Sequence, residues 1–125
     1  MPTTRRAKTS FNIARELALK LPGVTEGFSY GTPSFRAGSR FLARLKEDGD
    51  SLVLRIPFED RERLLKEQPE VFYLTDHYVN YPAVLLRLSK ISRRDLGEVL
   101  ERAWQRLVPK PRPATKPKAR GSRKG

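Results

Sequence analysis

Residues 31–56 alternate apolar and polar side chains in runs that are separated by two glycine-containing turns. The first turn contains Gly38-Ser39 and the second contains Asp48-Gly49. A period of two is typical of β-strands, and an Asp-Gly pair favours a tight hairpin because glycine accepts the positive φ that such a turn needs. This segment therefore predicts a three-stranded antiparallel meander, around which the other elements must be placed.

Helical periodicity occurs on both sides of this meander. Apolar residues recur at helical spacing from Ser10 to Leu21, and Pro22-Gly23 ends that segment. Residues 57–70 carry acidic side chains in their first turn and the apolar pair Leu64-Leu65. This pattern predicts a short middle helix that covers one face of the sheet.

The rest of the chain predicts further strands and a last helix. Residues 83–89 form a near-continuous apolar run of strand length, which predicts a strand. We expect a short strand at 71–74 before it, and a mostly extended, aromatic-rich segment that joins the two. Ser92 and Asp95 have the spacing of a capping box at the start of an amphipathic helix. We predict one α+β domain at residues 10–108, a two-layer sandwich with N-terminal, middle and C-terminal helices and an antiparallel sheet of about four to five strands.

The positive charge is concentrated at the two ends of the chain. The net charge is +12 from 26 basic and 14 acidic residues, but residues 1–9 and 109–125 contain no acid and supply +10 of it. The last segment is rich in proline and carries seven cations. They are Lys110, Arg112, Lys116, Lys118, Arg120, Arg123 and Lys124. We predict disordered basic tails at 1–9 and 109–125, of which the second binds phosphates without sequence preference.

The composition also limits the other classes of function. The chain contains no cysteine and one histidine, so we expect neither a metal site nor a cofactor. No apolar run is long enough to span a membrane, and no apolar anchor accompanies the cationic tail, so we expect no stable membrane insertion and a cytoplasmic location. No nucleophile motif, paired-carboxylate signature or phosphate-binding glycine loop is present, so we expect no enzyme.

Several sequence motifs resemble those of the MmcQ/YjbR-like family. They are GTPSFR at 31–36, TDHYVNYPAVLLRL at 75–88 and ERAWQRL at 101–107, and the resemblance extends over about residues 11–110. It implies a compact α+β fold with an antiparallel sheet and DNA binding through a double-wing arrangement of hairpins. It implies no catalytic residues.

The first candidate site is the predicted hairpin together with the strand that follows it, because these segments carry four arginines. They are Arg36, Arg40, Arg44 and Arg55. Strict alternation directs Phe41, Ala43 and Leu45 into the core and Arg40, Leu42 and Arg44 away from it, whereas the face of Arg36 depends on the register. These guanidinium groups could bind phosphates while the Gly38-Ser39 turn enters a groove as a wing. The alternative is a solvated strand face whose arginines pair with nearby acids.

The second candidate site is the aromatic segment 73–81, which holds the only histidine. Its candidate ligand-binding or partner-binding residues are His77, Tyr78, Asn80 and Tyr81. Tyrosines stack on bases and an asparagine can bind a base edge, but the same rings could equally pack under the last helix. Catalysis would need His77 to be oriented by a carboxylate, and the adjacent Asp76 does not supply that geometry.

Two functions of different classes follow. The first is a non-enzymatic protein that binds DNA, with RNA as a further ligand, through the basic hairpin and the cationic tail. The second is a module that binds a protein or a small ligand through the aromatic segment. The two differ in salt dependence, because phosphate contacts are screened and apolar contacts are not.

Overall fold

The computed structural model describes residues 8–29 and 31–107, so both predicted tails lie outside the described residues. Its helices and strands follow the order helix, four strands, helix, two strands, helix, with two short 3-10 helices. The elements are α1 (Phe11–Leu19), β1 (Val24–Ser29), β2 (Thr32–Ala37), β3 (Arg40–Leu45), β4 (Ser51–Arg55), α2 (Phe58–Glu67), β5 (Phe72–Tyr73), η2 (Asp76–Tyr78), β6 (Ala83–Arg87), η3 (Leu88–Lys90) and α3 (Arg93–Leu107).

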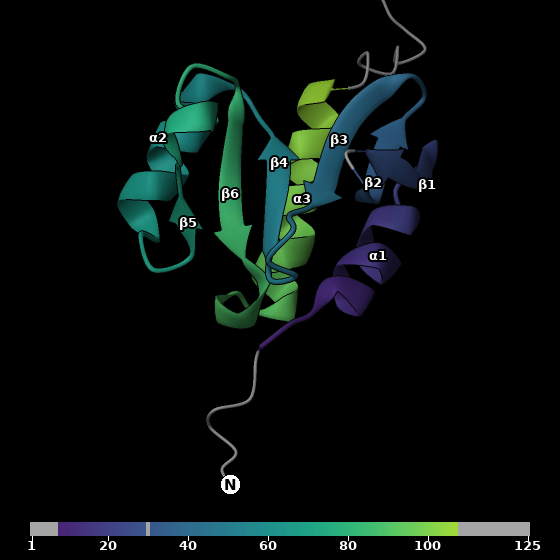
Figure 1. The fold of residues 1–125 in the computed structure, drawn as a ribbon, viewed down its shortest axis with the longest axis horizontal. Coiled ribbons are helices and arrows are strands. Elements are labelled where there is room, and N and C mark those ends of the chain that lie inside the picture. Colours follow the sequence, from purple (N-terminus) through teal and green to yellow (C-terminus); the bar gives the residue numbers. More distant parts are fainter. Residues whose placement is uncertain (1–7, 30, 108–125) are drawn as a thin grey trace, which may run out of the picture.

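One antiparallel sheet of six strands has the order β1-β2-β3-β4-β6-β5. Figure 1 shows α3 behind the central strands, α1 beside it, and α2 at the end of the sheet formed by β5. The main core lies between the sheet and the helices and includes Phe35, Leu54 and Leu100. The predicted α+β fold with three helices is confirmed, and the sheet has more strands than the four to five expected.

The extra strand is β1, which the sequence pattern did not reveal. Most of its residues are exposed, and it contains Glu26 and Gly27, which are uncommon in strands, so it lacks the apolar alternation of a typical strand. Its residues pair with β2 along their whole length, from Val24 opposite Ala37 to Ser29 opposite Thr32. The meander therefore has four strands instead of three.

Two further boundaries differ from the prediction. The first helix ends at Leu19 rather than at Leu21. The segment before β6 is not mostly extended, because residues 76–78 form the 3-10 helix η2. The Asp48-Gly49 turn is as predicted: the Asp48 carboxylate accepts hydrogen bonds from the backbone amides of Asp50 and Ser51 at 2.9 and 2.8 Å, and Gly49 has a φ of 77°.

A β-bulge in β3 overturns part of the predicted alternation. Phe35 pairs with Ala43 but Arg36 pairs with Phe41, so Leu42 is the additional residue on β3. Leu42 was expected to point outward, yet it is fully buried in the main core together with Ala43. The bulge likewise removes Phe41 from the core side, where it was expected, and brings it to the face that carries Arg36.

The same bulge separates Arg40 from the other hairpin arginines. Its guanidinium donates a hydrogen bond of 2.8 Å to the carbonyl of Leu107, at the end of α3. Arg40 therefore extends toward the helices, and the predicted pairing of Arg40 with Arg44 on one outward face is wrong. A single inserted residue changes the composition of the candidate basic surface.

Candidate functional site

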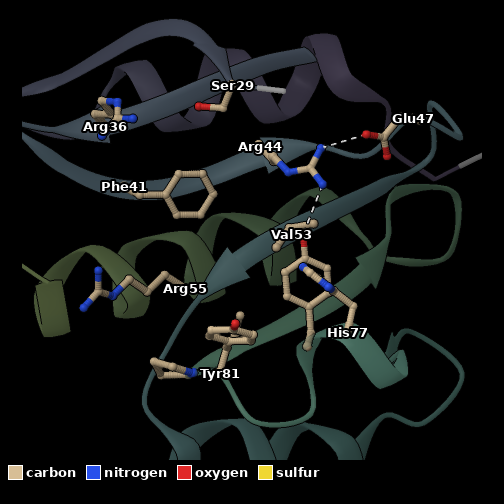
Figure 2. A pocket seen from close by; sticks show the side chains of 12 residues that line it. Ser29, Arg36, Phe41, Arg44, Glu47, Val53, Arg55, His77 and Tyr81 are labelled. Atoms are coloured by element: carbon tan, nitrogen blue, oxygen red, sulfur yellow. Dashed lines mark hydrogen bonds and ion pairs between the residues drawn. The ribbon is translucent and has the colours of Figure 1, made fainter. Parts of the chain in front are cut away.

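The face of the sheet opposite α1 and α3 contains a pocket of about 750 Å³. Figure 2 shows side chains from β2, β3 and β4 on one side of this pocket and side chains from the 77–83 segment on the other. We call it the arginine-aromatic pocket. It is lined by Ser29, Arg36, Phe41, Arg44, Glu47, Val53, Arg55, His77, Tyr78, Tyr81, Pro82 and Ala83.

Three of the four candidate arginines, Arg36, Arg44 and Arg55, line the arginine-aromatic pocket. Arg36 is exposed, and its guanidinium donates to the backbone carbonyl of Ser39 at 3.2 Å. Arg55 is also exposed, and its guanidinium forms no hydrogen bond or ion pair with the residues that the structure describes. Two solvated guanidinium groups are thus available to an anion at the opening of the pocket.

Arg44 differs from these two because it is only 7% exposed. Its guanidinium donates to the Tyr78 hydroxyl at 3.1 Å and forms an ion pair of 3.4 Å with Glu47, whose side chain is 61% exposed. Burial disfavours the charged form, but the contacts with Tyr78 and Glu47 outweigh it and raise the pKa of Arg44 above its ordinary value. Arg44 therefore contributes a permanent, rigidly held positive charge to the pocket.

Glu47 is the one acidic side chain in the lining, against three arginines. Its own backbone amide and the charge of Arg44 lower the pKa of Glu47, so it is ionised at neutral pH. The side chains around the pocket therefore have an excess of positive charge, and a ligand with negative charge matches them.

The aromatic side chains form a cluster on the loop side of the pocket. The His77 and Tyr78 rings meet edge to face with centroids 4.6 Å apart, and the Tyr81 ring lies 5.9 Å from His77 and 6.5 Å from Tyr78. Tyr81 is 54% exposed, and Tyr78 packs against Val53, Ala83 and Leu85, so these two rings do not pack under the last helix as the alternative interpretation expected. The fourth candidate, Asn80, is exposed and does not line the pocket.

A buried arginine that the sequence analysis did not single out holds the loop in place. Arg61 in α2 is 5% exposed, and its Nη1 donates to the backbone carbonyls of Val79 at 3.1 Å and Tyr81 at 2.9 Å. Its guanidinium also stacks over Phe58 and pairs with Glu62. Arg61 therefore fixes the segment that carries the aromatic side of the pocket.

The neighbouring part of the same sheet face is closed by Tyr73. Its hydroxyl hydrogen bonds with that of Ser51, and the Arg87 guanidinium lies 4.1 Å from the centre of its ring. Val53 and Leu85 are buried beneath Tyr73 and Tyr78. The open part of the face is consequently limited to the pocket side.

The surroundings of His77 can be compared with what a general base needs. No carboxylate in residues 8–29 and 31–107 hydrogen bonds to His77, although Asp76 directly precedes it in η2. The described rings next to His77 are those of Tyr78 and Tyr81, and the three arginines line the same pocket.

Comparison with protein families identifies the relatives of this chain. A family model named YjbR matches residues 19–106, which is most of the described part. The chain belongs to the YjbR family. This family is the one that the sequence motifs resembled.

The chain is also similar to individual proteins. Uncharacterized proteins of Mycobacterium bovis and Mycobacterium tuberculosis, among them Rv2570, are 38% identical over 76 residues, which is 60% of this chain and 55% of theirs. The chain thus spans about half the length of these relatives. The crystal structure of Deinococcus radiodurans protein DR2400 has a similar fold, with a TM-score of 0.65 and 22% identity over 80% of this chain and 79% of that chain.

Proposed function

We propose that this YjbR protein is a non-enzymatic nucleic-acid-binding protein whose folded domain contacts DNA through the arginine-aromatic pocket. The supporting observation is that strands β2, β3 and β4 and the 77–83 segment contribute three arginines and four aromatic rings, those of Phe41, His77, Tyr78 and Tyr81, to one open pocket. Nucleic acid combines phosphates, which guanidinium groups bind, with flat bases, which aromatic side chains bind. The two surfaces that the sequence suggested as rivals are therefore parts of one site in this proposal.

Each group has a separate part in the proposed binding. Arg36 and Arg55 are solvated and lose little when they exchange water for phosphate oxygens. Arg44 supplies a fixed charge deeper in the pocket, where it is held by Tyr78. Binding through the sheet face replaces the predicted insertion of the Gly38-Ser39 turn into a groove, because Arg40 beside that turn is engaged with α3.

The cationic residues after 108 add to this binding in the proposal. Lys110, Arg112, Lys116, Lys118, Arg120, Arg123 and Lys124 lie outside the described residues, so only their charge and spacing support a role. They would raise affinity for any polyanion, including RNA, in a salt-dependent manner.

The proposed ligand also bears on the compartment, because a protein that binds nucleic acid is expected in the cytoplasm. Among the described residues, no helix is long and apolar enough to cross a membrane.

The concave shape of the pocket favours a second candidate, binding of a small anionic ligand. A volume of about 750 Å³ lies within the range of roughly 300–1,000 Å³ that is usual for small-molecule sites. Val53, Ala83 and Phe41 give it apolar walls beside the arginines. A free nucleotide or another aromatic anion would use the same contacts.

The test is fluorescence anisotropy with a short labelled DNA and the full chain. Arg36→Ala combined with Arg55→Ala removes two pocket cations, and the control Arg94→Ala combined with Arg102→Ala removes two exposed cations from α3. Both doubles lower the net charge equally. We expect the pocket double to weaken binding about tenfold more than the control and to reduce the slope of log affinity against log salt by about 1.5 to 2. Equal effects of the two doubles would contradict a site at the pocket.

A further inference from the structure

The arginine-aromatic pocket differs from a purely electrostatic surface in one respect, the exposure of its rings. Phosphate binding needs only cations, yet Tyr81 keeps 54% of its surface in solvent and His77 is also exposed. Both lie in a segment that Arg61 holds rigidly through the carbonyls of Val79 and Tyr81. A rigid, exposed ring is a low-entropy platform for another flat group.

The positions of the rings leave the pocket side of Tyr81 open to such a group. Figure 2 shows the Phe41 ring extending from β3 and the Tyr81 ring extending from the loop, with Arg55 beside the opening between them. Tyr78 is held by its hydrogen bond to Arg44. An entering planar group would meet Tyr81 and Phe41 as apolar surfaces and the Arg44-Tyr78 pair as a polar one.

Stacking on Tyr81 requires a base with an uncovered face, and a paired duplex does not offer one. In a duplex the faces of each base are covered by its neighbours, so a ring can stack on a base only where the base is unpaired or extruded. The pocket is concave, its cations Arg36 and Arg55 are exposed on the strand side, and the Tyr81 ring lies opposite them on the loop side. A phosphate at the opening would therefore direct an attached base inward.

We propose that the arginine-aromatic pocket binds an unpaired nucleobase of a DNA strand, stacked on Tyr81, with the adjoining phosphates on Arg36 and Arg55. This inference rests on the proposed nucleic-acid function and specifies the form of nucleic acid that the folded domain prefers. The preference is for single strands over duplexes. The tail cations supply affinity for both forms and do not discriminate between them.

The test compares three DNA probes of equal length with the full chain. They are a single strand of mixed sequence, the same strand annealed to its complement, and a strand of abasic sites with the same number of phosphates. Tyr81→Ala removes the ring, and Tyr81→Phe keeps it as the matched control. Because the Tyr81 side chain is exposed and only its backbone carbonyl binds Arg61, both variants keep the contacts that hold the fold.

We expect Tyr81→Ala to weaken binding of the single strand about tenfold and to leave the abasic strand and the duplex within about twofold, while Tyr81→Phe binds all three as the original does. Equal losses on the single strand and the abasic strand, or no loss on either, would overturn base stacking. If at the same time the Arg36-Arg55 double still weakens binding more than its α3 control, nucleic-acid binding stands and only the unpaired base is refuted. If neither set of variants matters, the proposed function fails as well.

Discussion

Replacement of Arg61 by alanine tests how the loop side of the pocket is held. The guanidinium donates to the carbonyls of Val79 and Tyr81 at 3.1 and 2.9 Å, and its contacts with the carbonyls of Tyr78 and Ala83 at 3.4 and 3.5 Å are longer. Each hydrogen bond from a charged donor contributes about 1.5–3 kcal/mol, and the carbonyls left unpaired add to the loss. The pair with Glu62 adds at most about 1 kcal/mol because Glu62 is largely exposed.

We therefore expect Arg61→Ala to lower the free energy of unfolding by about 3 kcal/mol. Urea denaturation of the full chain measures it as a shift of the midpoint at unchanged m-value. Glu62→Ala is the matched control, with an expected loss below about 1 kcal/mol. Arg61→Lys keeps the charge but not the planar donor group, so its loss should be intermediate. A loss for Arg61→Ala no larger than that for Glu62→Ala would refute the claim that Arg61 holds the loop.

Three further predictions concern other parts of the fold. Burial alone would raise the pKa of the Asp48 carboxyl, but the amides of Asp50 and Ser51 and the Ser51 hydroxyl lower it. The stability that this turn contributes is therefore present above the unfolded-state pKa of about 3.9 and is lost as the pH falls through the lower folded-state pKa. In a titration of stability with acid, Asp48→Asn should remove this pH-dependent contribution. Trp104→Phe removes the 3.0 Å hydrogen bond from the indole nitrogen to the Pro22 carbonyl and should cost about 1 kcal/mol in urea denaturation; an unchanged midpoint would refute a role for that bond. Arg40→Ala, which removes a cation outside the pocket, should weaken DNA binding in anisotropy less than Arg36→Ala does, and the reverse order would favour a wing at the Gly38-Ser39 turn.

Much of the fold could be predicted because local signals agreed with the tertiary structure. Ser92 does cap α3, with its hydroxyl accepting from the Asp95 amide at 3.1 Å, and the Asp48-Gly49 pair forms the expected turn. β1 was missed because its stability comes from pairing with β2 and not from its own composition. Pairing between strands is a tertiary property, which a short window of sequence does not record.

The candidate site was only partly predictable for a related reason. The arginines and the aromatic residues were both identified, but nothing in their spacing indicated that they share one pocket. The bulge at Leu42 reversed the faces of Arg40 and Phe41, because one inserted residue shifts every position on one side of it. Arg61 gave no signal either, since an arginine in a short polar helix is usually solvated.

An NMR titration of the full chain with a short single-stranded DNA tests the central claim most directly, because it reports every backbone amide at once. If the arginine-aromatic pocket is the binding site, the largest shift changes should fall on its lining in β2, β3 and β4 and on residues 77–83, and they should persist at salt concentrations that remove non-specific contacts. Shift changes confined to residues 108–125 would contradict the account. They would assign DNA binding to the cationic tail alone.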